Sequence, residues 1–429
     1  ACTFAFIRKD HARIYPRPCR GMSSMTDRNV LGSDLYTDQV DPEELAQVVL
    51  EVLGAGAYES ADEVIYRRPG HPPALRFGFR KNELRTVKAG PGLSQDDIRS
   101  IQSKIRTDIL DLNRKIVGRM ILFSAYPVTG RLRIGNLLQV SPAPNHISTS
   151  KQSEKGYHPF LIEFEVCDSP NLSIRGYRIS SKAQKLSLLL SLFAEGDVLV
   201  PSTSNHFRWI SRNDPKSQYE QMLEEYGYGE FRPYQDMFTE SDTLPNIELV
   251  DDRQYFRENG FALGYPLRLP VSFEELVRAF ARLSPALQET FSRAGYWYHL
   301  AKRQESYSAY FLHLIQSIET LLPSAKARER CSECGKEKIG PTSRFNEFLN
   351  ELAPAHSDLD QARKKLYTLR SNLSHGWDIC GRDFGRIHLP NSMDQTMRVI
   401  EAYQLARFAL INWLNRYSVQ PSESTRLNL

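Results

Sequence analysis

The C-terminal part of the sequence, from Ser272 onwards, repeats apolar residues at the three- and four-residue spacing of amphipathic helices. One such stripe lies within residues 304–322 and consists of Tyr307, Phe311, Leu314, Ile318 and Leu321. A second stripe lies within residues 358–375 and consists of Leu359, Ala362, Leu366, Leu369 and Leu373. Narrow apolar stripes on consecutive helices with short or moderate connections predict an all-α antiparallel bundle over residues 270–429.

The preceding part of the chain has a different pattern, with shorter apolar runs separated by turn residues. Helices are predicted at residues 41–53, from about residue 94, and at residues 181–194. Strands are predicted at residues 119–125, 132–140, 160–167 and 173–179, and near 198–200. A chain of 429 residues also exceeds the size of one ordinary domain. We therefore expect an α+β protein with a mixed α/β domain at residues 1–212, a connector at residues 213–269, and the helical bundle.

The composition is that of an ordinary globular protein, with 41% hydrophobic and 25% charged residues. A net charge of +4 permits nucleic-acid binding but does not indicate it, because strongly basic binders carry denser clusters of charge. Six cysteines in a chain of this length do not make a disulfide framework. No apolar run approaches the roughly 20 residues that span a bilayer, and the apolar run at the N-terminus is too short for a signal peptide. By elimination, we expect a cytoplasmic protein with no membrane segment.

An arginine and a histidine, Arg370 and His375, stand five positions apart at the predicted end of the helix at residues 358–375. The guanidinium offers a phosphate a permanent cation and a planar set of donors, and a histidine can move protons near neutral pH. Residues five apart on a straight helix differ by about 140° around its axis, so the two side chains converge only if the helix ends between them. Gly376 predicts such an end. The alternative is an exposed arginine and a helix-ending histidine favoured by the helix dipole.

Glu319 is a carboxylate among apolar residues on the predicted helix at residues 304–322. Because an unpaired buried charge is costly, a cationic partner is expected, and Arg370 is the natural candidate. The alternative is that Glu319 lies at the polar edge of its stripe and only keeps the helix soluble.

The bundle and the run from Arg370 to Gly376 together resemble the HEPN superfamily (higher eukaryotes and prokaryotes nucleotide-binding), in particular the Apea-like HEPN domains of bacterial defence proteins. The resemblance covers residues 270–417. It implies a metal-independent endoribonuclease with no catalytic cofactor, in which His375 is the general base or acid at the ribose 2′-hydroxyl and the leaving oxygen. Arg370 would bind the scissile phosphate.

The resemblance also implies a homodimer through the helical bundle, with two motifs facing one cleft. This chain departs from the family at Ser371, because many members have Asn, Asp or His directly after the arginine. Either Asn372 takes over the orientation of the substrate, or the catalytic set is weaker.

A Cys-x2-Cys pair, Cys331 and Cys334, is followed by a glycine inside the predicted bundle. This spacing lets two thiolates hold one tetrahedral zinc ion, and Cys380 with a histidine would complete the site. A zinc ion there would be structural, because the thiolates close the site. The alternative is a pair of exposed thiols in a polar insertion.

Basic residues surround this insertion: Lys326, Arg328, Arg330, Lys336, Lys338 and Arg344. Lys364 and Lys365 lie one to two turns before Arg370, and Tyr367 and Trp377 are close to it in the sequence. Lysines and aromatic rings in this arrangement would bind single-stranded RNA by charge and by base stacking. The alternative is an ordinary solvated face.

These features predict a HEPN-type endoribonuclease that acts as an anti-phage or toxin-like effector and leaves a 2′,3′-cyclic phosphate. The domain at residues 1–212 would sense a phage-derived or nucleotide trigger. The alternative is a non-catalytic HEPN module that binds RNA, a nucleotide or a protein partner.

Overall fold

The protein forms two compact units, residues 1–110 and residues 111–429, each of which is considered by itself. The computed structural model describes residues 40–54, 56–60, 62–80, 83–111, 113–144, 156–193, 198–199, 209–212, 221–224, 232–240, 243–258, 266–322, 340–353, 357–385 and 390–418. Helices and antiparallel sheets are both present, so the α+β class expected from the sequence is confirmed.

The first unit combines helices with a four-stranded antiparallel sheet of strand order β1-β2-β3-β4. Its elements are α1 (Pro42–Leu53), β1 (Gly56–Ser60), β2 (Glu63–Tyr66), β3 (Leu75–Arg80), β4 (Glu83–Ala89), α2 (Gln95–Lys104) and the π-helical turn η1 (Ile105–Leu110). Helix α1 begins where predicted, because the carboxylate of Asp41 accepts the Glu43 N–H at 2.8 Å. The sheet at residues 56–89 is absent from the sequence-based prediction.

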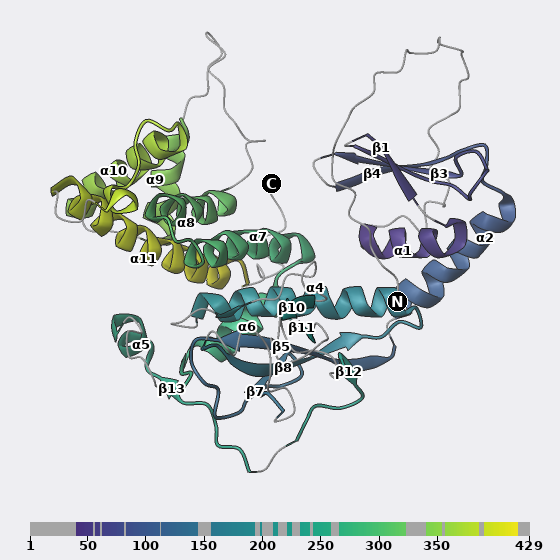
Figure 1. Cartoon of the computed structure of the whole chain (residues 1–429), viewed down its shortest axis with the longest axis horizontal. Coiled ribbons are helices and arrows are strands. Elements are labelled where there is room, and N and C mark those ends of the chain that lie inside the picture. Colours follow the sequence, from purple (N-terminus) through teal and green to yellow (C-terminus); the bar gives the residue numbers. More distant parts are fainter. Residues whose placement is uncertain are drawn as a thin grey trace, which may run out of the picture. The chain divides into compact units, whose positions relative to one another are not determined.

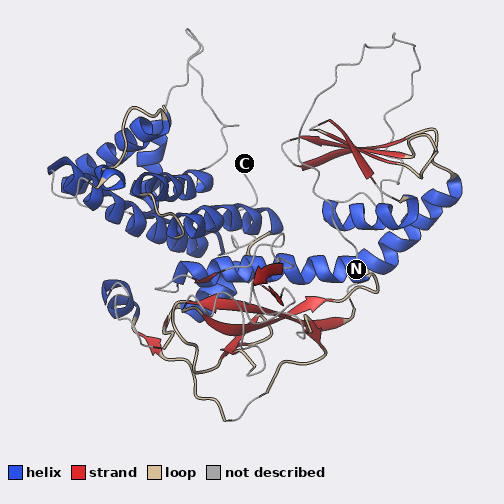
Figure 2. Ribbon diagram, in the orientation of Figure 1, coloured by secondary structure: helices blue, strands red, loops and turns tan. Residues whose placement is uncertain are grey.

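The second unit is built on a six-stranded antiparallel sheet of order β12-β5-β8-β7-β6, with β9 also paired to β5 (Figures 1 and 2). Its strands are β5 (Lys115–Ser124), β6 (Leu132–Ile134), β7 (Leu138–Pro142), β8 (His158–Cys167), β9 (Val198–Leu199) and β12 (Tyr234–Gln235). Strands β10 (Trp209–Arg212) and β11 (Gln221–Glu224) form a separate antiparallel pair, and β13 (Leu249–Val250) pairs in parallel with β14 (Leu269–Pro270).

Helix α4 (Leu172–Phe193) covers one face of this sheet (Figure 2). Ile162 and Phe164 of β8 share a core with Ile179 of α4, because alternate residues of a strand point to the same face. The strand predicted at residues 173–179 is wrong, since these residues are the first turns of α4. The side chain of Asn171 caps the start of this helix by accepting the Ser173 N–H at 2.9 Å. This cap is local in the sequence, and the prediction of a strand overlooked it.

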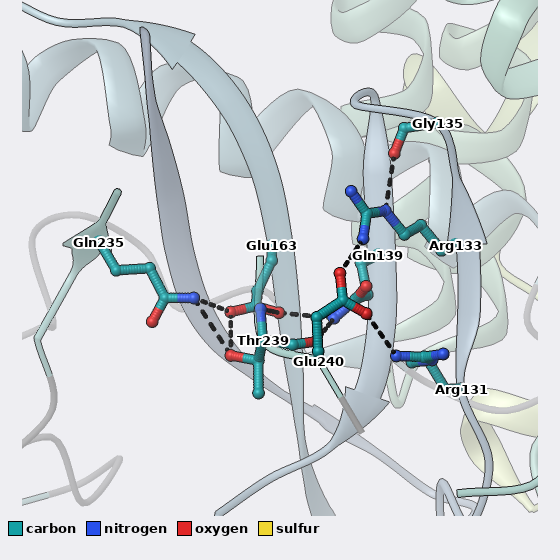
Figure 3. A network of polar contacts seen from close by, with 8 residues as sticks. All are labelled: Arg131, Arg133, Gly135, Gln139, Glu163, Gln235, Thr239 and Glu240. Atoms are coloured by element: carbon teal, nitrogen blue, oxygen red, sulfur yellow. Dashed lines mark hydrogen bonds and ion pairs between the residues drawn. The ribbon is translucent and has the colours of Figure 1, made fainter. Parts of the chain in front are cut away.

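The opposite face of the sheet carries a fully buried carboxylate, that of Glu163 (Figure 3). Arg119 of β5 contacts it at 3.2 Å through Nε, and Gln139 of β7 donates to it at 2.7 Å. Strand β12 and the segment after it cover this carboxylate, because Gln235 of β12 donates to it at 2.8 Å and the Thr239 hydroxyl donates to it at 2.7 Å. The region predicted as a connector therefore contributes β12 to the sheet and two side-chain hydrogen-bond donors to Glu163.

The remaining helices are α5 (Asp252–Glu258), α6 (Phe273–Arg282), α7 (Pro285–Lys302), α8 (Tyr307–Leu321), α9 (Pro341–Leu352), α10 (Ser357–Ser374), the 3-10 turn η4 (Gly381–Phe384) and α11 (Pro390–Ser418). Helices α7 to α11 form the C-terminal bundle, whereas α5 lies beside β13 (Figure 1). One hydrophobic core joins the sheet, α4 and the bundle, and it includes Phe164, Leu189, Phe291, Leu314 and Leu410. This shared core explains why the compact units divide after Leu110, whereas the sequence suggested boundaries after residues 212 and 269.

His299 on α7 lies at the contact between the bundle and α4, where its Nδ1 and the Ser191 hydroxyl are 3.0 Å apart. Burial, together with the nearby Lys302 and Arg303 charges, lowers its pKa from 6.5 to about 3. The folded protein therefore keeps this ring neutral at pH values where the unfolded chain would protonate it.

We expect the free energy of unfolding to fall as the pH drops through 6.5, because only the unfolded state takes up this proton until about pH 3. For this group alone the loss between pH 7 and pH 5 is about 2 kcal/mol. Urea unfolding of the wild type and of His299→Gln at both pH values measures it, since other titrating groups cancel in the difference. Equal pH dependence of the two proteins would contradict the assignment.

Candidate active site

Helix α10 ends at the position that Gly376 predicts. The Trp377 N–H donates to the Asn372 carbonyl at 2.9 Å, and the Gly376 N–H donates to the Leu373 carbonyl at 3.2 Å. Gly376 has a φ of 71°, the left-handed conformation that favours glycine. These two hydrogen bonds and this φ form a Schellman motif. His375 consequently stands exposed at the last turn of α10, with its backbone N–H still bonded to the Ser371 carbonyl.

Glu319 of α8 forms the expected ion pair with Arg370 of α10, with Oε2 and Nη2 separated by 3.1 Å. The pair is partly shielded, because the Arg370 and Glu319 side chains are 31% and 21% exposed. A partly shielded pair is screened less by salt than a fully exposed one. Helices α8 and α10 thus place one carboxylate and one guanidinium side by side.

Tyr367, one turn before Arg370, completes this cluster. Its ring centroid lies 5.6 Å from the guanidinium carbon of Arg370 and 5.2 Å from the ring centroid of Phe345 on α9. Burial raises the pKa of the Tyr367 phenol, and the charge of Glu319 and a hydrogen bond to it act in the same direction. The phenol therefore stays protonated and donates to Glu319. Tyr367, predicted as an RNA-binding residue, is half-buried and also holds the Glu319 carboxylate in place.

His375 has different neighbours from Arg370. Its ring stacks on Trp377, with centroids 4.9 Å apart and planes inclined by 28°. Trp377 is 76% exposed, so its free face is accessible to a base. Within the described residues, no contact joins the His375 ring to the Arg370 guanidinium. The two groups lie on successive parts of one helix end, each held by its own partner.

The other predicted RNA-contacting residues lie on the same helix. Lys364 and Lys365 are exposed, as RNA-binding lysines would have to be. Asn372 is half-buried, and its carbonyl is one of the acceptors that close the helix end.

The segment after His375 is fixed to the start of α8 by Asp383, a residue that sequence reasoning missed. The Asp383 carboxylate accepts four hydrogen bonds, from the Tyr307 and Ser308 N–H groups and from the Ser306 and Ser308 hydroxyls. Burial alone would raise the pKa of this carboxyl, but the hydrogen bonds outweigh it and hold the pKa below its ordinary value. No local sequence motif predicts this contact, because the residue that caps the start of α8 lies more than 70 residues away in the sequence.

The predicted zinc ligands are only partly within the structure. Cys331 and Cys334 lie outside the described residues. Cys380 is buried with a free thiol, whose pKa burial raises, and its backbone N–H donates to the Ser308 hydroxyl. Over the part of the chain that is described, no three His, Cys, Asp or Glu side chains are grouped as metal ligands. The structural zinc site stays a prediction.

Comparison with known proteins adds no relative. The chain matches no protein-family model, and neither the curated proteins nor the solved structures yielded a match. None of the described helices is long and apolar enough to cross a membrane.

Proposed function

We propose that the protein is a metal-independent endoribonuclease of the HEPN type. The observation that carries the proposal is the end of α10, which exposes His375 one residue beyond the helix while Glu319 holds Arg370 on the preceding turn. An exposed imidazole that can transfer a proton and an oriented guanidinium at one helix end suit the cleavage of a phosphodiester.

In the proposed reaction, His375 removes the proton from a ribose 2′-hydroxyl. The resulting oxygen attacks the adjacent phosphorus, and the bond from phosphorus to the 5′-oxygen breaks. The products are a 2′,3′-cyclic phosphate and a 5′-hydroxyl, which takes up one proton. Arg370 stabilises the negative charge that develops on the phosphate, and Asn372 orients the substrate.

A homodimer through the bundle would supply the second histidine for protonation of the leaving oxygen. Exposed apolar residues support such an interface, because Met393, Met397 and Ile400 lie on α11 at a spacing of four and three residues. Ile379 and Phe384 are exposed in the segment that Gln395 ties to α11 through the Gly381 N–H. A second copy of the chain would cover these side chains.

The physiological role that we propose is that of an anti-phage or toxin-like effector in the cytoplasm. The separate compact unit at residues 1–110 supports control by an additional module, which would respond to a phage-derived or nucleotide trigger.

A second candidate function is a non-catalytic module that binds RNA, a nucleotide or a protein partner. The observation in its favour is that Glu319 already neutralises Arg370 and that His375 contacts Trp377 instead. In this case the site would bind one of these ligands without catalysing a reaction.

The experiment is RNA cleavage by the purified full chain in EDTA, comparing the wild type with Arg370→Ala. We expect cleavage that persists in EDTA and is lost in the variant, because no metal takes part and the phosphate loses its cation. Arg278→Ala is the matched control, since Arg278 also pairs with a glutamate on the bundle, Glu274, at 2.6 Å. RNA binding without cleavage, unaffected by either substitution, would contradict the nuclease and favour the binding module.

A further inference from the structure

Arg344 lies in the first turn of α9, beside the cluster of Glu319, Tyr367 and Arg370. Its backbone N–H donates to the Gly340 carbonyl at 3.1 Å, which fixes it at the start of the helix. The next residue, Phe345, is fully buried and packs its ring against that of Tyr367. The contact between these rings brings the start of α9 to the same part of α10 that carries Arg370.

The guanidinium of Arg344 has no ion pair and no hydrogen-bond acceptor among the described residues, unlike the guanidinium groups of Arg370 and Arg363. Arg370 pairs with Glu319, and Arg363 donates to the Asn350 side chain at 3.2 Å. Arg344 is half-buried. Its Nε is shielded from solvent and has no acceptor among the described residues, so an external anion can reach only the terminal Nη groups. A partly desolvated guanidinium without a counter-charge favours such an anion.

The local charge balance also favours the binding of an anion at Arg344. The cluster contains one carboxylate, Glu319, and two guanidinium groups, Arg344 and Arg370. The charges of both arginines reach the Tyr367 phenol, where they counteract the effect of Glu319. Because Glu319 forms its ion pair with Arg370, the positive charge of Arg344 is the one that stays uncompensated within the cluster.

We propose that Arg344 binds a backbone phosphate of single-stranded RNA next to the phosphate held by Arg370. This inference rests on the proposed function. Arg344 is then a binding residue, and it places the substrate so that one phosphate lies within reach of the end of α10. Its planar donors match the oxygens of a phosphate, and a bidentate contact would also fix the orientation of the strand.

The test is binding of a 2′-O-methyl RNA oligonucleotide, which lacks the attacking hydroxyl and cannot be cleaved, by the full chain at several salt concentrations. We expect Arg344→Ala to raise the Kd about tenfold. The slope of log Kd against log salt should fall in magnitude by roughly 0.7, the value for one contact with a single-stranded phosphate. Arg344→Lys should retain the slope and lose part of the affinity, because it keeps the charge without the planar donors.

Arg293→Ala is the matched control, since Arg293 is an exposed arginine on α7 whose loss removes the same charge from the bundle. An unchanged Kd and slope in Arg344→Ala, with a wild type that cleaves RNA through Arg370, would overturn this inference alone. A wild type that neither binds the oligonucleotide nor cleaves RNA would overturn both proposals. The melting temperature of each variant shows whether it is folded. A variant with a folding defect would melt at a lower temperature, and it would not show the fall of the salt slope expected for the loss of one phosphate contact.

Discussion

Replacing His375 with alanine is expected to slow RNA cleavage by about two to four orders of magnitude. In the proposed reaction, the substitution removes the group that takes the proton from the 2′-hydroxyl. His375 is exposed at the end of α10, so the fold should not change. Single-turnover cleavage of a labelled RNA oligonucleotide in EDTA measures the rate, and analysis of the fragments for a 2′,3′-cyclic phosphate identifies the reaction.

His158→Ala is the control for this variant, because His158 is also exposed and lies on β8 in the same unit. A rate for His375→Ala within a factor of three of the wild-type rate would contradict the proposed role of His375. Retained affinity for the 2′-O-methyl oligonucleotide would show that the loss concerns catalysis and not binding.

Replacing Glu163 with alanine is expected to lower the free energy of unfolding by about 3–5 kcal/mol. The carboxylate is fully buried and accepts from Gln139, Gln235 and Thr239, and its loss would also remove the ion pair with Arg119. Urea unfolding at pH 7 measures the change.

Glu165→Ala is the matched control, because Glu165 lies two residues further along β8 on the same face and is 32% exposed. Its ion pair with Lys115 is long, at 3.8 Å, so we expect a loss below about 1 kcal/mol. A similar loss in both variants would show that the network around Glu163 adds no stability beyond that of a surface pair.

The parts of the fold that follow from local periodicity could be predicted. The apolar stripes located α8 and α10 to within a few residues, and Gly376 located the end of α10 because glycine alone readily adopts the conformation required there. The pair of Glu319 and Arg370 was also predictable, since a carboxylate on a core-facing helix needs a cation nearby.

Features that depend on contacts distant in the sequence could not be predicted. Glu163 looks like an ordinary polar residue of an alternating strand, and only the return of the chain at Thr239, 76 residues later, buries it. Asp383 likewise caps a helix that begins at Tyr307. Arg344 appeared only as one basic residue among several, because its place beside Tyr367 follows from the packing of α9 on α10, which brings Phe345 against that ring.

The continuous core of the second unit limits how the chain can be divided by proteolysis. Arg407 of α11 donates to the Phe193 carbonyl at the end of α4, and His299 meets Ser191 on the same helix. Proteolytic separation of the bundle from α4 would expose the core that they share to water, so we expect a fragment of the bundle alone to aggregate. If the proposed function holds, control by ligands or subunits acting on the intact chain is therefore favoured over activation by proteolysis.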